Sequence, residues 1–196
     1  MNAFLRLIEE RDDEALRGAL EINPDLADMP DASIQVLPLS YATRLKNSAA
    51  VVALLQAGAN PNQVFKGRAA LDVAAFHDAR ACGEALLDRG ADPNIRDEIG
   101  RTPLMTAAKF GARDMLDLLL SRGADVRLAD QRGRTALHWA ATGEHSDVKV
   151  VKILLAAGAE RDRQTIDGLT ASEYARRMKL SELVSELEVN GTNHLR

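Results

Sequence analysis

Short apolar stretches of helical length recur along the chain, and a Gly-Ala pair ends each of them. The stretches read VVALLQA, GEALLDR, MLDLLLS and VVKILLA, and the pairs begin at Gly58, Gly90, Gly123 and Gly158. These glycines are 32, 33 and 35 residues apart. Glycine just beyond a helix adopts the left-handed conformation without a Cβ clash. The pattern therefore predicts a helix end at each pair, and its period indicates a repeat architecture.

A second string opens an earlier helix in each unit. It is clearest as Thr102-Pro103-Leu104 and recurs as Thr135-Ala136-Leu137 and Thr170-Ala171-Ser172. We expect Thr102 to accept an N-cap hydrogen bond and Pro103 to occupy the first helical position. Thr170 and Glu173 have the spacing of a capping box. Each unit is therefore predicted to contain two helices.

The best copy runs from Asp97-x-x-Gly100-x-Thr102-Pro103-Leu104 through Leu118-Leu119-Leu120 to Gly123-Ala124-Asp125, and it resembles the ankyrin repeat. The resemblance covers nearly the whole chain. It implies an all-α solenoid, in which each unit has a β-turn, two antiparallel helices and a return loop, and the units stack side by side.

We divide the chain into six units that form a single domain, because no linker or shift in composition separates them. Each unit can bury its apolar face only against its neighbours, so the end units are expected to act as caps. The predicted ranges are an N-terminal cap at 1–31, repeats at 32–63, 64–96, 97–129 and 130–164, a C-terminal cap at 165–190, and a flexible tail at 191–196.

Three departures from the repeat pattern carry predictions. Ala69-Ala70 replaces Thr-Pro, so the first helix of repeat 64–96 lacks a side-chain N-cap and this repeat should be among the less stable. Repeat 130–164 has two extra residues, which alignment places within Thr142–Asp147, between its helices. The junction from Gly58 to Gly67 is one residue shorter than the junction from Gly90 to Gly100.

Composition and charge narrow the function classes. Hydrophobic residues make up 46% and aromatics only 4%, which suits closely packed short helices, and the net charge of −4 excludes a globally basic nucleic-acid binder. Cys82 is the one cysteine, so an intrachain disulfide is impossible. Acidic residues interrupt the N-terminal apolar run and no stretch reaches the ~18 apolar residues of a membrane span. We expect a cytoplasmic monomer.

The candidate catalytic and metal-binding residues favour structural roles. His138 occupies the position at which ankyrin repeats usually carry a histidine, and the resemblance implies that it hydrogen-bonds adjoining loop backbone. His138 and His145 are too few for a zinc site when only one cysteine is present. Cys82 is expected to be a small buried hydrophobe, with His77 the only nearby base in sequence. We therefore predict no enzyme activity, no cofactor and no metal.

The resemblance also implies where a partner would bind, because ankyrin proteins usually bind through their β-turn tips and first helices, which line a concave face. The turn-tip positions carried over to this chain are Ser33, Ile34, Val36, Phe65, Lys66, Arg68, Glu98, Ile99, Arg101, Gln131, Arg132 and Arg134. Together with the first-helix positions they include seven cationic side chains, the single acid Glu98 and three phenylalanines. Arginines beside aromatic rings are typical of interface hot spots. We therefore predict a protein partner that offers an acidic or amphipathic segment to Arg44, Phe65, Lys66, Arg68, Phe76, His77, Ile99, Arg101, Lys109, Phe110, Arg132 and Arg134.

The sequence leaves several alternatives open. Phe76 and Phe110 either contact a partner or pack between adjacent first helices, and the arginines either bind or simply keep the turn tips soluble. The same face could instead bind nucleic acid or an anionic lipid, although the acidic total and few aromatics argue against this. A third hypothesis makes the chain an accessory subunit of an enzyme.

Overall fold

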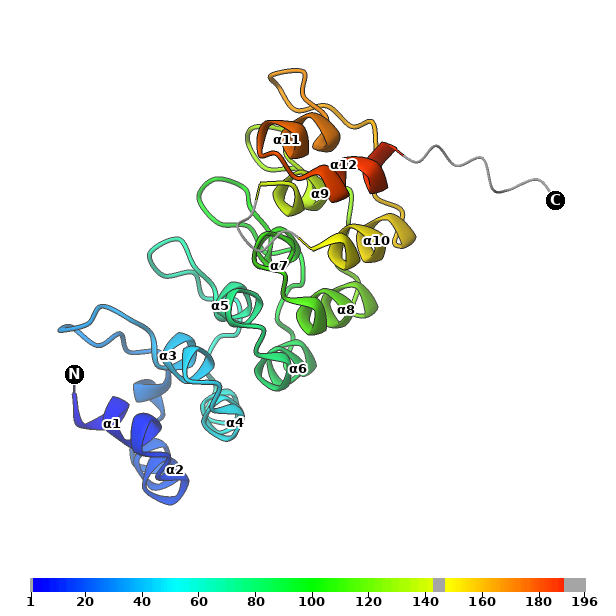
Figure 1. Ribbon diagram of the computed structural model, residues 1–196. Helices are drawn as coiled ribbons and strands as arrows, with labels where there is room; N and C mark the ends of the chain where they lie inside the picture. The colour runs from blue at the N-terminus through cyan, green and yellow to red at the C-terminus, as the bar shows by residue number, and fades with distance from the viewer. Residues whose placement is uncertain (1, 143–146, 189–196) are drawn as a thin grey trace.

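The computed structural model describes residues 2–142 and 147–188, and its α-helices follow one another as pairs (Figure 1). Within those ranges there is no β-strand, only two isolated bridges, and no helix long and apolar enough to span a bilayer. The all-α repeat fold predicted from the sequence is confirmed. The helices are α1 Ala3–Glu10, α2 Asp13–Ile22, α3 Pro38–Arg44, α4 Ser48–Gln56, α5 Ala70–His77, α6 Arg80–Asp88, α7 Pro103–Phe110, α8 Arg113–Ser121, α9 Ala136–Ala140, α10 Val148–Ala156, α11 Ala171–Arg177 and α12 Ser181–Glu188, with a 3₁₀ turn, η1, at Pro24–Ala27.

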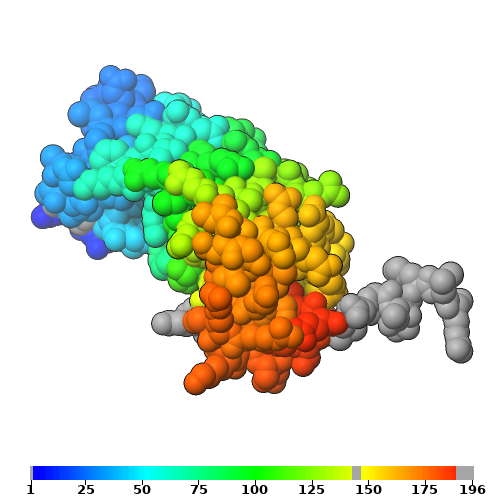
Figure 2. Space-filling view, turned by 90° about the horizontal axis from the view of Figure 1, so that it is seen from above, coloured from blue at the N-terminus to red at the C-terminus, as the bar shows by residue number. Residues whose placement is uncertain are grey.

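The helices form two parallel rows (Figure 1). The odd-numbered helices, here called first helices, lie in one row, and the even-numbered second helices lie in the other. The connections that lead into α3, α5, α7, α9 and α11 project from the side of the first helices, and together they form the first-helix face. The space-filling view shows an elongated body with the N-terminal helices at one end and α11 and α12 at the other (Figure 2).

The core runs along the length of the solenoid between the two rows. First helices contribute small buried residues such as Ala74, Ala75 and Ala107, which let neighbouring first helices approach closely. Second helices contribute larger ones such as Leu86 and Leu119, which fill the space between the rows. Since α7 packs on α5 and α9, and α6 packs on α4 and α8, each pair buries its apolar surface against its neighbours.

The helix starts follow the expected chemistry. The Thr102 Oγ1 accepts the N–H of Met105 at 3.4 Å, and Pro103 is the first residue of α7. In α11 the N–H of Thr170 donates to the Glu173 Oε2 at 2.7 Å, and the N–H of Glu173 donates to the Thr170 Oγ1 at 3.3 Å, which completes the capping box. Ala69 precedes α5 with no side-chain cap. All three predictions are confirmed.

The hairpin before α5 is tighter than those that follow. The N–H and C=O of Phe65 pair with those of Arg68 at 3.0 and 3.1 Å, and the two residues between them have positive φ. In the next two hairpins Asp97 and Asp130 stand in the place of Phe65, and they pair with Arg101 and Arg134. Three residues, instead of two, lie between the paired residues of these hairpins. Grouping Phe65 with the tip residues was therefore wrong, because the shorter junction places it at the hairpin base.

Asparagine side chains link neighbouring units on the side of the return loops. The Asn62 amide donates to the Gly90 carbonyl at 2.9 Å, and its Oδ1 accepts the N–H of Asp92 at 2.7 Å. Asn94 repeats both bonds one unit later, to the backbone of residues 123 and 125. Arg127 stands at the next equivalent position, and among the described residues its side chain makes no such bond. These links, here called the asparagine ladder, therefore join the return loops after α4, α6 and α8 and, in the described residues, do not extend to the loop after α10.

His138 lies fully buried on α9 and joins two units. Its Nδ1 accepts the N–H of Thr135 at 3.2 Å, and its Nε2 lies 3.2 Å from the Leu169 carbonyl of the following unit, so the ring is neutral with its hydrogen on Nε2. The hydrogen bond to adjoining loop backbone that was predicted for His138 is therefore confirmed. Burial is the largest effect on this ring and lowers the pKa of His138, although the Leu169 carbonyl opposes the shift.

Two predicted features fall on residues that the structure does not describe. The insertion within Thr142–Asp147 includes residues 143–146, which lie outside the described ranges, as does the tail at 191–196. Seven residues connect α9 to α10, whereas two connect α7 to α8, and α9 is three residues shorter than α7. The connection between α9 and α10 is therefore longer partly because α9 ends earlier in its unit than α7 does in its own.

The missing cap on α5 predicts a stabilising substitution. Ala69 has φ −92° and ψ 159°, close to the −98° and 163° of the capping Thr102. Ala69→Thr should therefore raise the free energy of unfolding by ~1 kcal/mol in urea denaturation. Ala69→Val has the same shape without the hydroxyl. Equal stabilisation by both variants would show that capping is not the cause.

The asparagine ladder predicts that a substitution at Asn94 lowers the stability of the fold and that one at the equivalent Arg127 does not. Asn94→Ala removes two hydrogen bonds to the next unit and should lower the free energy of unfolding by about 1–2 kcal/mol. Arg127→Ala, one unit later, should change it by less than ~0.5 kcal/mol. The two variants are compared in urea denaturation, and equal costs would contradict a specific role for the amide.

The buried histidine predicts a pH-dependent stability. Because the pKa of His138 is lowered in the folded chain, the unfolded chain takes up the proton first as pH falls. The free energy of unfolding should therefore be full above pH ~6.5 and decline below it. His138→Leu should be less stable at every pH, yet lose less between pH 7.5 and 5.5 than the unaltered chain. An unchanged pH slope in this variant would refute the assignment.

Candidate functional site

The structure places the predicted partner-binding residues along the first-helix face. Arg44 and Lys109 occupy the seventh helical position of α3 and α7, where α5 has Phe76. The set divides by exposure. The half-buried members are Phe65, Phe76, His77, Arg101, Lys109, Phe110 and Arg134, and the exposed members are Arg44, Lys66, Arg68, Ile99 and Arg132.

Two phenylalanines form an aromatic contact between neighbouring first helices. The rings of Phe76 on α5 and Phe110 on α7 meet edge to face, with their centroids 4.4 Å apart. The His77 ring lies 4.8 Å from Phe76 in a similar arrangement. Packing between first helices is therefore confirmed for Phe76 and Phe110, and both rings also keep part of their surface exposed.

Trp139 lies at the centre of a cluster that the sequence interpretation missed. This side chain on α9 is only 6% exposed, and its ring is approached by the guanidinium of Arg134 at 4.0 Å, the ammonium of Lys109 at 5.2 Å and the guanidinium of Arg101 at 5.7 Å. Two neighbouring units thus contribute three cations to one ring, at distances that suit cation–π attraction.

The sequence contains a pattern that could have identified Trp139 as a candidate site residue. It is the fourth residue of α9, the position that α3 and α11 fill with Tyr41 and Tyr174. Arg134 directly precedes the capping Thr135, and side chains with this spacing pack together at helix starts. The indole Nε1 is buried and has no hydrogen-bond partner among the described residues. An aromatic position shared by three units could therefore have been added to the predicted set.

Ion pairs change the charge balance that the sequence suggested. Arg101 pairs with Asp97 at 3.0 Å and Arg134 with Asp130 at 2.8 Å, and all four side chains are largely buried. Asp97 and Asp130 also accept backbone N–H groups of their own hairpins. Longer pairs join Arg68 to Asp72 and Arg132 to Asp167. Glu98 is the only acid among the counted positions, but the net positive charge of this face is smaller than the count suggested, because four of the seven cations have an acidic neighbour outside those positions.

Exposed isoleucines mark the hairpin tips. Ile34 and Ile99 are each 42% exposed, and Ile166, in the hairpin before α11, is 71% exposed. The sequence interpretation included the first two at the tips and missed the third. Because large apolar side chains that share one face mark interaction sites, the tips extend the aromatic surface of the first helices.

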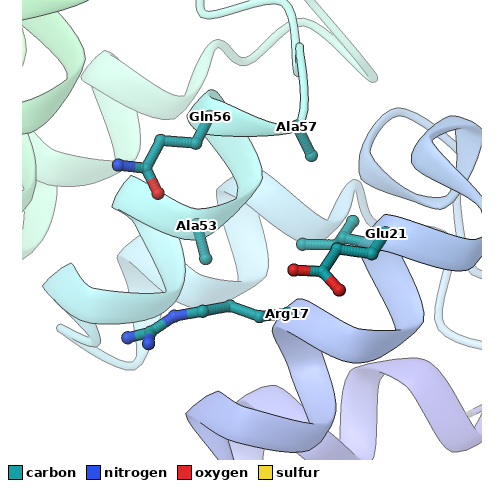
Figure 3. A pocket seen from close by; sticks show the side chains of 6 residues that line it. Arg17, Glu21, Ala53, Gln56 and Ala57 are labelled. Carbon is teal, nitrogen blue, oxygen red and sulfur yellow. The ribbon is translucent and has the colours of Figure 1, made fainter.

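The opposite side of the molecule has a shallow hollow of about 240 Å³ between α2 and α4. Arg17 and Glu21 on α2 face Ala53 and Gln56 on α4, with Leu20 and Ala57 completing the lining (Figure 3). This lining contains no thiol, hydroxyl or imidazole, and its ionisable side chains are Arg17 and Glu21.

The remaining reactive groups also lack catalytic surroundings. Cys82 is buried on α6, and burial raises the pKa of its thiol to about 11, so the nucleophilic thiolate is scarce at neutral pH. Within residues 2–142 and 147–188 no three His, Cys, Asp or Glu side chains converge as a metal site would require. His145 lies outside these ranges.

Comparison with known families agrees with the geometry. A family model of ankyrin repeats, each match spanning three copies, fits residues 39–130, 71–165 and 104–193 in overlapping windows. A comparison with curated proteins found no match. Ankyrin repeats are generally protein–protein interaction modules and are typically non-catalytic. Because the matched windows together cover most of the sequence, the chain belongs to the ankyrin-repeat family.

Proposed function

We propose that this chain is a non-catalytic adaptor that binds a partner protein on its first-helix face, the side expected to be concave. One observation carries the proposal. Four consecutive first helices each hold an aromatic ring beneath a cation, with Phe76 and Phe110 half-buried and Tyr41 and Trp139 buried. The pairs are Tyr41 with Arg44, Phe76 with Arg68, Phe110 with Lys109, and Trp139 with Arg134. We call this row the aromatic strip.

The aromatic strip suits binding because its side chains are already held in place. Each cation–π contact restricts a long side chain, and the ion pairs to Asp97 and Asp130 restrict Arg101 and Arg134 further. A partner that docks here loses less side-chain entropy than it would on free arginines. Tryptophan, tyrosine and arginine are also the residues that most often dominate binding energy at interfaces.

The charge distribution favours a protein partner over a polyanion. Four of the seven cations on this face have acidic neighbours, so little uniform positive potential remains for a nucleic acid or an anionic membrane to follow. The exposed isoleucines at the tips instead favour an apolar contact. The proposal keeps the expectation of a monomeric cytoplasmic protein, with an accessory role in an enzyme complex as the remaining alternative.

The proposal predicts that the tips contribute to binding and not to stability. The partner is isolated by affinity capture, purified, and titrated against the chain while the emission of Trp139, the only tryptophan, is followed. Binding should change this emission. Ile99→Ser together with Ile166→Ser should weaken the affinity by about tenfold or more, because each exchange removes an apolar side chain from the interface.

Ile22→Ser together with Val52→Ser provides the matched control. These residues are 87% and 38% exposed on α2 and α4, away from the proposed interface. All four exchanges should leave the thermal midpoint nearly unchanged. A partner that binds without changing Trp139 emission, and that is weakened only by the control pair, would place the interface on the second helices.

A further inference from the structure

A group of cations lies at one end of the aromatic strip, where the first helices end. Arg11 follows α1, Arg44 ends α3, and Lys46 lies in the connection to α4. The Arg11 Nη2 donates to the Leu45 carbonyl at 3.3 Å, which brings its guanidinium beside that connection. All three side chains are exposed, and within the described part of the chain none of them has an ion pair. Arg11, Arg44 and Lys46 are called the cationic cluster below.

The acids nearest in sequence do not neutralise this cluster. The Asp12 Oδ1 accepts the N–H of Ala15 at 3.0 Å and caps α2. The Asp78 Oδ1 accepts the N–H of Met115 at 2.9 Å and so lies against α8. Glu10 is exposed on α1, and no ion pair joins it to Arg11 in the described residues. The cluster therefore differs from Arg101 and Arg134, whose charges are compensated.

Two neighbouring groups respond to this positive potential. Burial is the main cause that lowers the pKa of His77, and the charges of Lys46, Arg44 and Arg68 lower it further. Burial raises the pKa of Cys82 on α6, and the charges of Arg11 and Lys46 oppose this rise. The cluster and Arg68 thus act on the same part of the molecule, at the ends of α3 and α5.

Two of these cations occupy backbone positions that suit glycine better. Arg11 has φ 58° and Lys46 has φ 53°, both in the left-handed region. After α7 the equivalent position is Gly111, with φ 69°. Side chains in this conformation lower stability relative to glycine. Glycine can therefore replace Lys46 and remove its charge without weakening the fold, whereas at Arg11 it also removes the hydrogen bond to the Leu45 carbonyl.

We infer that the cationic cluster binds acidic side chains of the partner segment that lies on the aromatic strip. The inference rests on the proposed function and gives the segment a direction, acidic towards α1 and α3 and apolar towards Trp139. A short acidic peptide fits better than a long polyanion, because Asp97 and Asp130 neutralise the arginines farther along the face. The chain's own net charge of −4 also disfavours an extended polyanion.

The probe for this inference is hexaglutamate, with hexaglutamine as the uncharged control. Either peptide is titrated at low salt into the full chain labelled with ¹⁵N, and backbone amide shifts are followed. Hexaglutamate should shift residues 11, 44–46 and 77, and hexaglutamine should not. Lys46→Gly and Arg11→Gly should each weaken hexaglutamate binding roughly two- to fivefold, as expected for one exposed ion pair.

Lys179→Gly is the matched control. Lys179 also follows a first helix, has φ 61°, and donates its N–H to the carbonyl three residues earlier, as Lys46 does. It lies at the other end of the solenoid, after α11. Both lysine variants should keep or raise the thermal midpoint, and Lys179→Gly should leave hexaglutamate binding unchanged.

Three outcomes would overturn the inference. They are hexaglutamate shifts absent from residues 11 and 44–46, equal weakening by Lys179→Gly, and tighter binding of a short DNA duplex or of phosphatidylserine vesicles than of hexaglutamate. The captured partner separates this inference from the proposed function. If Ile99→Ser with Ile166→Ser weakens the partner's binding and Lys46→Gly does not, the cluster assignment fails and the proposed function stands.

Discussion

Each helix pair can bury its apolar surface only against the pairs beside it, and this constraint governs the rest of the structure. A pair of helices of eight or nine residues, such as α7 and α8, has too little apolar surface to form a core alone. The chain meets the constraint with small side chains between first helices and leucines between the rows. Polar links across unit boundaries add to this packing, through the amides of Asn62 and Asn94 and through the buried His138 ring.

The same stacking creates the candidate binding surface. Consecutive first helices lie side by side, so one aromatic ring on each of α3, α5, α7 and α9 forms a row along the solenoid, although the rings stand at the fourth, seventh, eighth and fourth helical positions. The hairpin acids then serve two purposes. Asp97 and Asp130 accept backbone N–H groups that shape their hairpins, and their second oxygens hold Arg101 and Arg134 against Trp139. Backbone geometry and surface chemistry are therefore coupled at these two residues.

Sequence reasoning succeeded where the determinant is local. The helix starts at Thr102 and Thr170 and the missing cap at Ala69 depend on one residue and its backbone conformation, and all were predicted. Sequence reasoning failed where the position of a side chain depends on the register of a hairpin or on contacts with a neighbouring unit. The junction before Phe65 is one residue shorter, which moved that ring from the tip to the hairpin base. The acids that pair with the arginines lie outside the positions that were counted, and two of the three cations around Trp139 come from the preceding unit.

The two ends of the first-helix face consequently differ in what they can bind. Around Trp139 every arginine is tied to an aspartate, so this part offers polarisable and apolar surface with little net charge. At the ends of α1 and α3 the cations lack such partners in the described residues, and two of them occupy left-handed positions where glycine would be less strained. Their link to the neighbouring unit is the exposed hydrogen bond from Arg11 to the Leu45 carbonyl, so these side chains contribute little to stacking. The charge there can change with little effect on the solenoid, so partner preference and fold stability are largely independent properties of this chain.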